Sequence, residues 1–141
     1  MTEQIPGGLF ALLHVAGTAQ AHVEARLAAV NLSLAKLGAL RAIAEAGESL
    51  PLGQLAERMS CVKSNITQLV DRLEADGLVR READPGDRRS RLAVLTDQGR
   101  ASWEQGNRIR IEAERELFGT LTTDEGRQLA ALMEKIEHGA A

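Results

Sequence analysis

The sequence is poor in the residues that build disulfide-linked, membrane-spanning or aromatic-rich proteins. Its 141 residues include one cysteine, no tyrosine and only 2% aromatic residues. Cys61 has no second cysteine to pair with, which excludes a disulfide-stapled secreted fold. No apolar run reaches membrane-spanning length, and the first residues lack the basic and apolar regions of a signal peptide. We therefore expect a cytoplasmic protein that does not bind a membrane.

The apolar residues that are present favour a mostly helical protein. Hydrophobic residues make up 44% of a chain that is long enough for one domain and its core. Because aromatic residues are scarce, the core must consist mainly of Leu, Ala, Ile and Val, which suits helix packing better than a β-sandwich. We expect a single domain, of the mostly α class, over residues 1–141.

Charge is distributed unevenly along the chain. The formal net charge is −3, a sum that argues against unselective binding to nucleic acid. Between Arg80 and Arg91, however, there are five basic and three acidic residues, whereas residues 101–141 carry five basic and eight acidic ones. The positive charge is therefore local, and the C-terminal segment would be kept away from a polyanion.

The helical spacing of apolar residues, together with capping residues, predicts six helices. They are expected at about 9–30, 34–46, 52–59, 63–76, 97–118 and 123–138. Ser33 is expected to cap the second helix and Gly47 to end it, while Thr96 opens the fifth. Thr122 and Glu125 form a T-x-x-E capping box for the last helix.

Between the fourth and fifth helices the apolar pattern changes to that of strands. Residues 78–82 and 91–95 are expected to form an antiparallel hairpin. The connection at 84–87 contains Pro85 and Gly86 where a type II turn requires them. The tip of this hairpin is charged and should be exposed.

Residues 34–96 therefore predict a winged helix-turn-helix. The helices at 52–59 and 63–76 are joined by a tight three-residue turn, and the hairpin, or wing, follows at once. The second of these helices is called the recognition helix below. Its apolar face, formed by Ile66, Leu69, Val70 and Leu73, is expected to be buried, so its polar residues must be exposed.

These polar residues suit contacts with DNA. Asn65, Thr67 and Gln68 could bind base edges in the major groove, whereas Lys63 and Arg72 suit phosphates. The wing arginines suit the narrow minor groove of A·T-rich DNA. The predicted DNA-binding residues are Lys63, Ser64, Asn65, Thr67, Gln68, Arg72, Arg88, Arg89 and Arg91.

Several segments together resemble the MarR family of winged helix-turn-helix transcriptional regulators. They are L-A-E-R-M at 55–59, I-T-Q-L-V-D-R-L-E-A-D-G-L-V at 66–79, D-R-R-S at 87–90 and L-T at 95–96. The spacing of these pieces is a specific joint signal, and the helix order matches over nearly the whole chain. The resemblance implies a winged helix-turn-helix lobe at about 34–96, flanked by dimerisation helices at about 9–30 and 97–138.

The resemblance also implies a function and partners. The expected function is sequence-specific regulation of transcription, as a ligand-responsive repressor that binds a pseudo-palindromic operator as a homodimer. The expected partners are double-stranded DNA, a second copy of the chain and a small lipophilic or phenolic effector, with no cofactor and no metal. The family pattern further suggests that Asp71 pairs with an arginine at the wing root, here Arg89, and that Asp87 also helps to orient the wing.

The turn before the recognition helix departs from the family pattern. Many relatives have glycine at the position of Ser60 and serine or threonine at that of Val62, so the usual helix cap is missing. Peroxide-sensing relatives carry their cysteine in the first helix, whereas Cys61 lies in this turn. A buried, inert thiol is the expectation for Cys61.

Other interpretations of these features remain open. His14 and His22 could line an effector pocket between the first helix and the winged lobe, or be ordinary surface or core residues. A winged-helix protein-interaction module without DNA affinity is the alternative function, whereas no enzyme is expected because no catalytic constellation is visible. Apolar residues of the terminal helices could cover the core of one subunit or form a dimer interface; they are Leu9, Phe10, Leu12, Leu13, Leu117, Phe118, Leu121, Leu129, Leu132 and Ile136.

Overall fold

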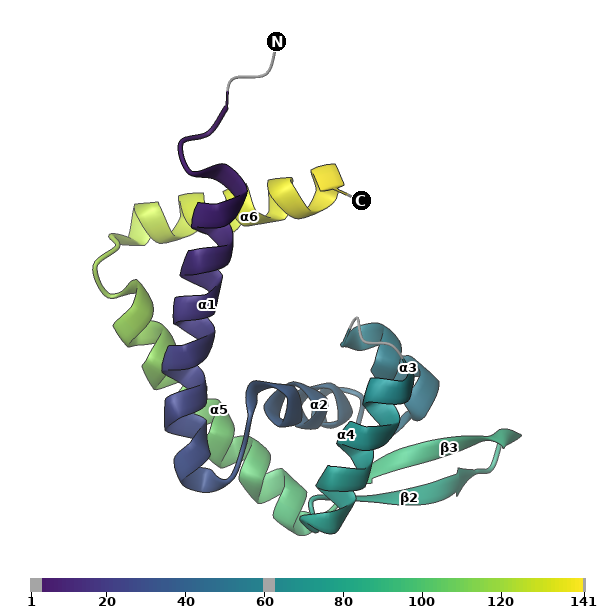
Figure 1. The fold of residues 1–141 in the computed structure, drawn as a ribbon. Helices are drawn as coiled ribbons and strands as arrows, with labels where there is room; N and C mark the ends of the chain where they lie inside the picture. The colour runs from purple at the N-terminus through teal and green to yellow at the C-terminus, as the bar shows by residue number, and fades with distance from the viewer. Residues whose placement is uncertain (1–3, 60–62, 141) are drawn as a thin grey trace.

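The computed structural model describes residues 4–59 and 63–140 of the chain (Figure 1). Helices dominate this part, and they confirm the predicted mostly α class with a small antiparallel sheet. In chain order the elements are α1 (Gly8–Leu27), a 3-10 turn (Ala28–Val30), α2 (Leu34–Glu45), β1 (Ser49–Pro51), α3 (Leu52–Arg58), α4 (Lys63–Ala75), β2 (Val79–Asp84), β3 (Asp87–Leu95), α5 (Asp97–Phe118) and α6 (Thr123–Ala140).

These elements form a lobe and an arm. The lobe contains α2, α3, α4 and the sheet, and the arm contains α1, α5 and α6 (Figure 1). Helices α1 and α5 pack along each other, and α5 also packs against α2 of the lobe. The largest fully buried side chains lie in the lobe and at its junction with α1; they are Leu27, Leu40, Ile43, Leu55, Val70, Leu73 and Val79.

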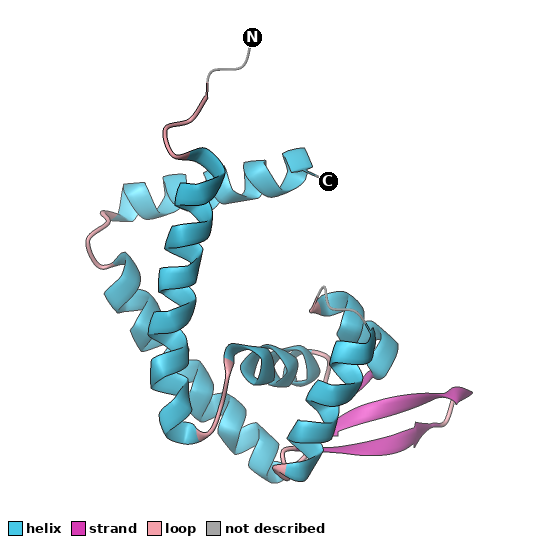
Figure 2. Cartoon of the chain, in the orientation of Figure 1, coloured by secondary structure: helices cyan, strands magenta, loops and turns pink. Residues whose placement is uncertain are grey.

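The sheet has one strand more than the sequence predicts. Its antiparallel order is β1-β3-β2, with Leu50 of β1 and Arg81 of β2 on opposite sides of Ala93. Strand β1 is three residues long, which is too short to show an alternating pattern. Figure 2 shows β2 and β3 extending away from the helices as a wing.

The turn of the wing differs from the predicted type. Strands β2 and β3 continue to Asp84 and from Asp87, so only Pro85 and Gly86 connect them. A type II turn needs a positive φ at its third residue, and Gly86 is not among the glycines that have one. Instead, the amide of Gly86 donates a hydrogen bond of 2.9 Å to Oδ1 of Asp84. The type II assignment was therefore wrong, and the aspartate side chain stabilises the turn.

The predicted helix caps are confirmed. Ser33 Oγ accepts a 3.1 Å hydrogen bond from the amide of Lys36, and Thr96 Oγ1 accepts one of 3.0 Å from the amide of Gly99. The capping box is reciprocal, because the amide of Thr122 donates to the carboxylate of Glu125 while the amide of Glu125 donates to the Thr122 hydroxyl. These local signals explain why the helix starts could be predicted.

Much of the arm is apolar and uncovered. Leu9 and Phe10 of α1 are 65% and 82% exposed, and no residue of α6 is buried. Most of the apolar residues listed for the terminal helices therefore do not cover the core of their own chain, which was one of the two interpretations, although Leu117 packs against this core and Val23 and Leu27 of α1 are buried in it. The other large exposed apolar residues are Ile5, Leu12, Leu13, Val15, Ile111, Phe118, Leu132, Met133 and Ile136.

In the described part of the chain, no single helix has the length and apolar character needed to cross a bilayer, and one bent pair, Gly8–Val30 with Leu34–Glu45, meets the criterion by length and composition only.

The start of α5 is fixed tightly to the lobe. The amide of Thr96 donates to the carbonyl of Leu78 at 3.1 Å, and its hydroxyl donates to the carbonyl of Gly77 at 2.6 Å. Arg100 forms a bidentate ion pair with Glu48, and its hydrogen bonds lower the pKa of the Glu48 carboxyl. A Cβ on Gly99 would stand 1.9 Å from the carbonyl oxygen of Leu78, so only glycine allows this approach.

The Gly99 contact predicts a large effect of one added methyl group. Gly99→Ala should lower the free energy of unfolding by about 1–3 kcal/mol or more, because the obstructing atom belongs to the backbone and cannot turn away. Gly53→Ala is the matched control, since nothing lies within 4 Å of its added Cβ and alanine favours the helix by up to about 1 kcal/mol. Urea denaturation of both variants at one protein concentration tests this, and equal stabilities would contradict it.

Candidate nucleic-acid interface

Helix α4 has one buried face, as the apolar pattern predicts. Ile66, Val70 and Leu73 are at most 2% exposed, and Leu69 is half-buried. The polar residues described on the rest of the helix are exposed; they are Asn65, Thr67, Gln68, Asp71, Arg72 and Glu74. The helix therefore presents a polar surface outward, beside the wing (Figure 1).

This polar surface is flanked by two grooves. On one side Thr67 and Ile66 line a groove of about 320 Å³ together with the start of α3 and with Arg89 and Arg91 of β3. On the other side lies a groove of about 280 Å³, lined by Ala35, Asn65, Gln68, Leu69 and Arg72. Thr67 thus faces the wing, whereas Asn65 and Arg72 face helix α2.

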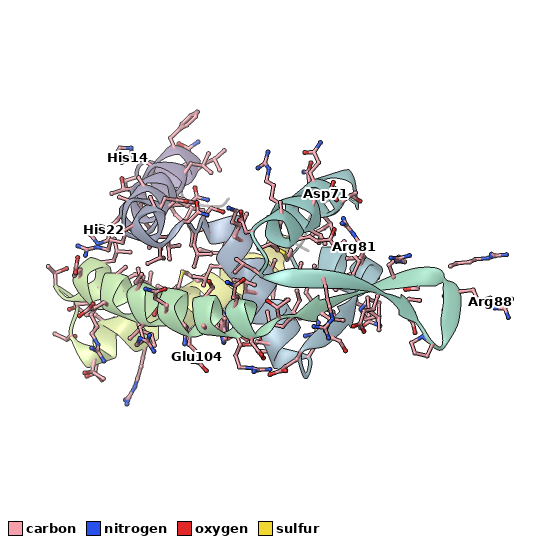
Figure 3. The ribbon with its side chains drawn as sticks, turned by 90° about the horizontal axis from the view of Figure 1, so that it is seen from below. His14, His22, Asp71, Arg81, Arg88 and Glu104 are labelled. Carbon is pink, nitrogen blue, oxygen red and sulfur yellow. The ribbon has the colours of Figure 1, made fainter. Side chains whose placement is uncertain are left out.

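One arginine holds β2 against the recognition helix. Arg81 Nη2 lies 2.6 Å from Oδ1 of Asp71 and donates to the carbonyl of Thr67 at 3.2 Å. Its Nη1 donates to Glu74 Oε1 at 3.0 Å, and its backbone amide donates to Glu74 Oε2 at 3.1 Å. The Arg81 side chain is only 17% exposed, whereas those of Asp71 and Glu74 are 60% and 43% exposed, so the guanidinium group of this clamp is shielded from water but its carboxylates are not. Figure 3 shows Asp71 and Arg81 at the junction of α4 and the wing.

The clamp corrects the partner expected for Asp71. The sequence suggested Arg89, but Arg81 occupies this place and Arg89 lies further along the wing. Sequence reasoning also missed Glu74, which binds both the backbone and the side chain of Arg81. The available signal was the strand alternation, which turns the side chains of Val79 and Arg81 to the same side of β2.

The wing presents arginines whose side chains have no partner in the described part of the chain. Arg88, Arg89 and Arg91 are exposed, and Figure 3 shows Arg88 extending from the tip. Asp87 Oδ1 instead accepts a 2.9 Å hydrogen bond from the backbone amide of Arg89. The carboxylates of Asp84 and Asp87 thus shape the tip, while the guanidinium groups remain available.

The two candidate pocket histidines do not meet in this chain. Both lie on α1, where His14 is exposed and His22 Nε2 lies 3.0 Å from Oε2 of Glu116 on α5 (Figure 3). Glu116 also pairs with Arg26. His22 therefore takes part in the packing of the arm, and neither histidine lines a described groove.

Some predicted features lie outside the described residues. They are the turn at 60–62 with Cys61, and the side chains of Lys63 and Ser64. Within the described ranges, no group of three or more His, Cys, Asp or Glu residues could hold a metal ion.

The lobe matches a family model. The model of the MarR family matches residues 30–90. This range includes α2, β1, α3, α4, β2 and the start of β3. The uncharacterized HTH-type transcriptional regulator YkoM of Bacillus subtilis is 37% identical over 84 residues, which are 60% of this chain and 54% of that protein. The transcriptional activatory protein BadR of Rhodopseudomonas palustris is 37% identical over 93 residues, which are 66% of this chain and 51% of that one. The chain thus spans about half the length of these relatives.

A solved structure resembles nearly the whole chain. A mutant MarR from Escherichia coli, crystallised with operator DNA, superimposes with a TM-score of 0.84 and 28% sequence identity. The match covers 91% of this chain and 92% of that one. The likeness therefore extends beyond the lobe to the arm.

The Arg81 clamp predicts a contrast between two adjacent arginines. Arg81→Ala should lower the free energy of unfolding by about 1.5–3 kcal/mol, because it leaves two carboxylates and a carbonyl without their shielded donor. Arg80→Ala should change it by less than about 0.5 kcal/mol, since Arg80 is exposed and its ion pair among the described residues is with exposed Glu82. Chemical denaturation measures both, and a larger loss in Arg80→Ala would disprove the assigned role of Arg81.

Proposed function

We propose that this chain is a member of the MarR family and a sequence-specific DNA-binding transcriptional regulator that represses a pseudo-palindromic operator as a homodimer. The observation that carries the proposal is the exposed polar surface of α4 beside a wing whose arginines Arg88, Arg89 and Arg91 are exposed and have no side-chain partner among the described residues. A helix of this kind fits the major groove, while arginines suit the minor groove and the phosphates. The likeness to a structure solved with operator DNA supports the same arrangement.

The acidic chain suits this function because its interface carboxylates are engaged internally. Asp71 and Glu74 pair with Arg81, and Asp76 pairs with Lys36 at 2.8 Å. Arg72 of α4 and Arg88, Arg89 and Arg91 of β3 have no such side-chain partners in the described ranges. A positive field is therefore available on this surface despite a net charge of −3.

The homodimer follows from the uncovered apolar surface of the arm. Exposed apolar patches of this extent mark interaction sites in small proteins, and a two-fold dimer is the commonest way to bury them. Such a dimer would place two recognition helices about 34 Å apart, one DNA turn, as a pseudo-palindromic operator requires.

The remaining parts of the proposal follow from the family. We propose a small lipophilic or phenolic effector that releases the DNA, with His14 and His22 as candidates for its pocket in the dimer. The MarR family is one of transcriptional regulators rather than enzymes, and we propose no catalytic activity here. Because the proposed ligand is operator DNA, we place the protein in the cytoplasm.

DNA binding is tested with promoter DNA from the protein's own gene and a scrambled duplex of equal length. Fluorescence anisotropy over a range of salt concentrations should show tighter binding to the promoter and affinity that falls with salt. Arg88→Ala should weaken binding to both duplexes and reduce the salt slope by about 1 per subunit, because one DNA contact is lost. Arg108→Ala, an exposed arginine of α5, should change neither quantity. Equal, salt-independent binding to both duplexes would disprove the function.

Dimerisation through the arm is tested separately. Leu132 is 56% exposed on α6, and Leu132→Glu would place an unpaired charge in the proposed interface. It should raise the dimer dissociation constant by about a hundredfold or more. Ala131→Glu adds the same charge about 100° around this helix, on the side of Glu134 and His138 and away from Met133 and Ile136, and should have a far smaller effect. Light scattering during size-exclusion chromatography measures both, and a wild-type chain that stays monomeric at micromolar concentration would refute the proposal.

A further inference from the structure

We infer that Gln68 is the residue of the recognition helix that reads a base, that this base is an adenine, and that Thr67 and Asp71 read none. The inference rests on the proposed DNA binding and deepens it. The sequence alone left Asn65, Thr67 and Gln68 as equal candidates, and the structure separates them by their position around α4.

Gln68 lies on the side of α4 that is farthest from its buried face; this side is called the crest below. Successive residues of an α-helix are about 100° apart, so Gln68 lies almost opposite the buried stripe of Ile66, Val70 and Leu73. Thr67 lies about a quarter turn from the crest toward the wing. If the helix enters the major groove with this side facing the base pairs, Gln68 is the residue nearest to the base edges.

The wing side of the helix is already occupied. Arg81 binds Asp71 at 2.6 Å and the carbonyl of Thr67 at 3.2 Å, and Thr67 lines the groove shared with Arg89 and Arg91. Asp71 is 60% exposed, but its carboxylate is held by the guanidinium group of Arg81. Asp71 therefore connects the helix to the wing through its side chain and Thr67 through its backbone carbonyl, while the Thr67 side chain lies in the groove beside the wing rather than on the side that faces the bases.

Gln68 has the chemistry that the crest position needs. Its exposed amide has no hydrogen-bond partner in the described part of the chain, so it keeps both a donor and an acceptor available. A glutamine amide can bind N6 and N7 of adenine together, and such a pair gives about tenfold or more discrimination against the other bases. Arg72 lies beside Gln68 in the groove toward α2 and suits the neighbouring phosphate.

Asn65 has the same amide group but a different position. It lies about 60° around the helix from Gln68, on the flank toward α2; both residues border the groove lined by Ala35 and Arg72, but Asn65 is the farther of the two from the crest. From this side an amide meets the sugar-phosphate backbone before it meets a base edge. We therefore assign Asn65 to the DNA backbone and Gln68 to the base.

The experiment selects operators from a library of random duplexes with wild-type protein and with Gln68→Arg. Wild-type protein should enrich sites with an adenine at one position in each half-site. Gln68→Arg should change this position to guanine, with a preference reversed by about tenfold or more, because arginine pairs with O6 and N7 of guanine. All other positions should keep their preference.

Two control variants complete the test. Thr67→Val retains the backbone carbonyl that Arg81 binds, and Asn65→Ala removes the competing amide; both should keep the wild-type base preference at every position, even if affinity falls. Base preference is a ratio of affinities, so partial loss of folding does not move it. An unchanged adenine in Gln68→Arg, or a changed base in either control, would overturn the inference. Wild-type protein that selects no sequence would instead refute the proposed function itself.

Discussion

The burial of three side chains on α4 determines how the rest of the molecule can work. Ile66, Val70 and Leu73 are packed in the core of the lobe, which fixes the rotation of the helix about its own axis. A helix can be fixed in this way only if its opposite face stays in solvent, and that face carries amides and an arginine. The position of every polar residue relative to DNA thus follows from an apolar contact on the far side of the helix.

The second determinant is where the acidic groups find their partners. A chain with net charge −3 would repel DNA if its carboxylates were free at the interface. Near α4 and the wing, however, Asp84 and Asp87 accept backbone amides, and Asp71 and Glu74 share Arg81. The Arg81 contacts that hold the wing in place therefore also offset one of the two negative charges of Asp71 and Glu74 beside the proposed DNA surface. In this region the Arg81 ion pairs therefore both position the wing and offset carboxylate charge.

The sequence predicts features that depend on nearby residues better than those that depend on distant ones. The helix caps at Ser33, Thr96 and Thr122 involve partners three residues away, and all three were predicted correctly. Strand β1 was missed because it is defined by pairing with β3, more than 40 residues later in the chain. The partner predicted for Asp71 was wrong for a related reason. The way in which β2 and β3 lie against α4 decides between Arg81 on β2 and Arg89 on β3, and this packing depends on distant residues. Likewise, helical periodicity identified the exposed face of α4, but only the folded lobe shows which flank the wing covers.

The N-terminal end of α5 connects these local features to the proposed dimer. Thr96, which caps α5, donates hydrogen bonds to the carbonyls of Gly77 and Leu78. These two residues lie between α4 and β2. Because Gly99 lies against the same carbonyl, α5 cannot tilt there without moving the end of the recognition helix. The distal part of α5 belongs to the arm, whose apolar surface is the proposed interface between subunits. Any change in the angle between two arms would therefore alter the separation of the two recognition helices, which must match one turn of DNA. A rigid contact at the lobe and an apolar contact at the arm would together give the proposed effector, bound at the arm, a direct mechanical route to the proposed DNA-binding surface.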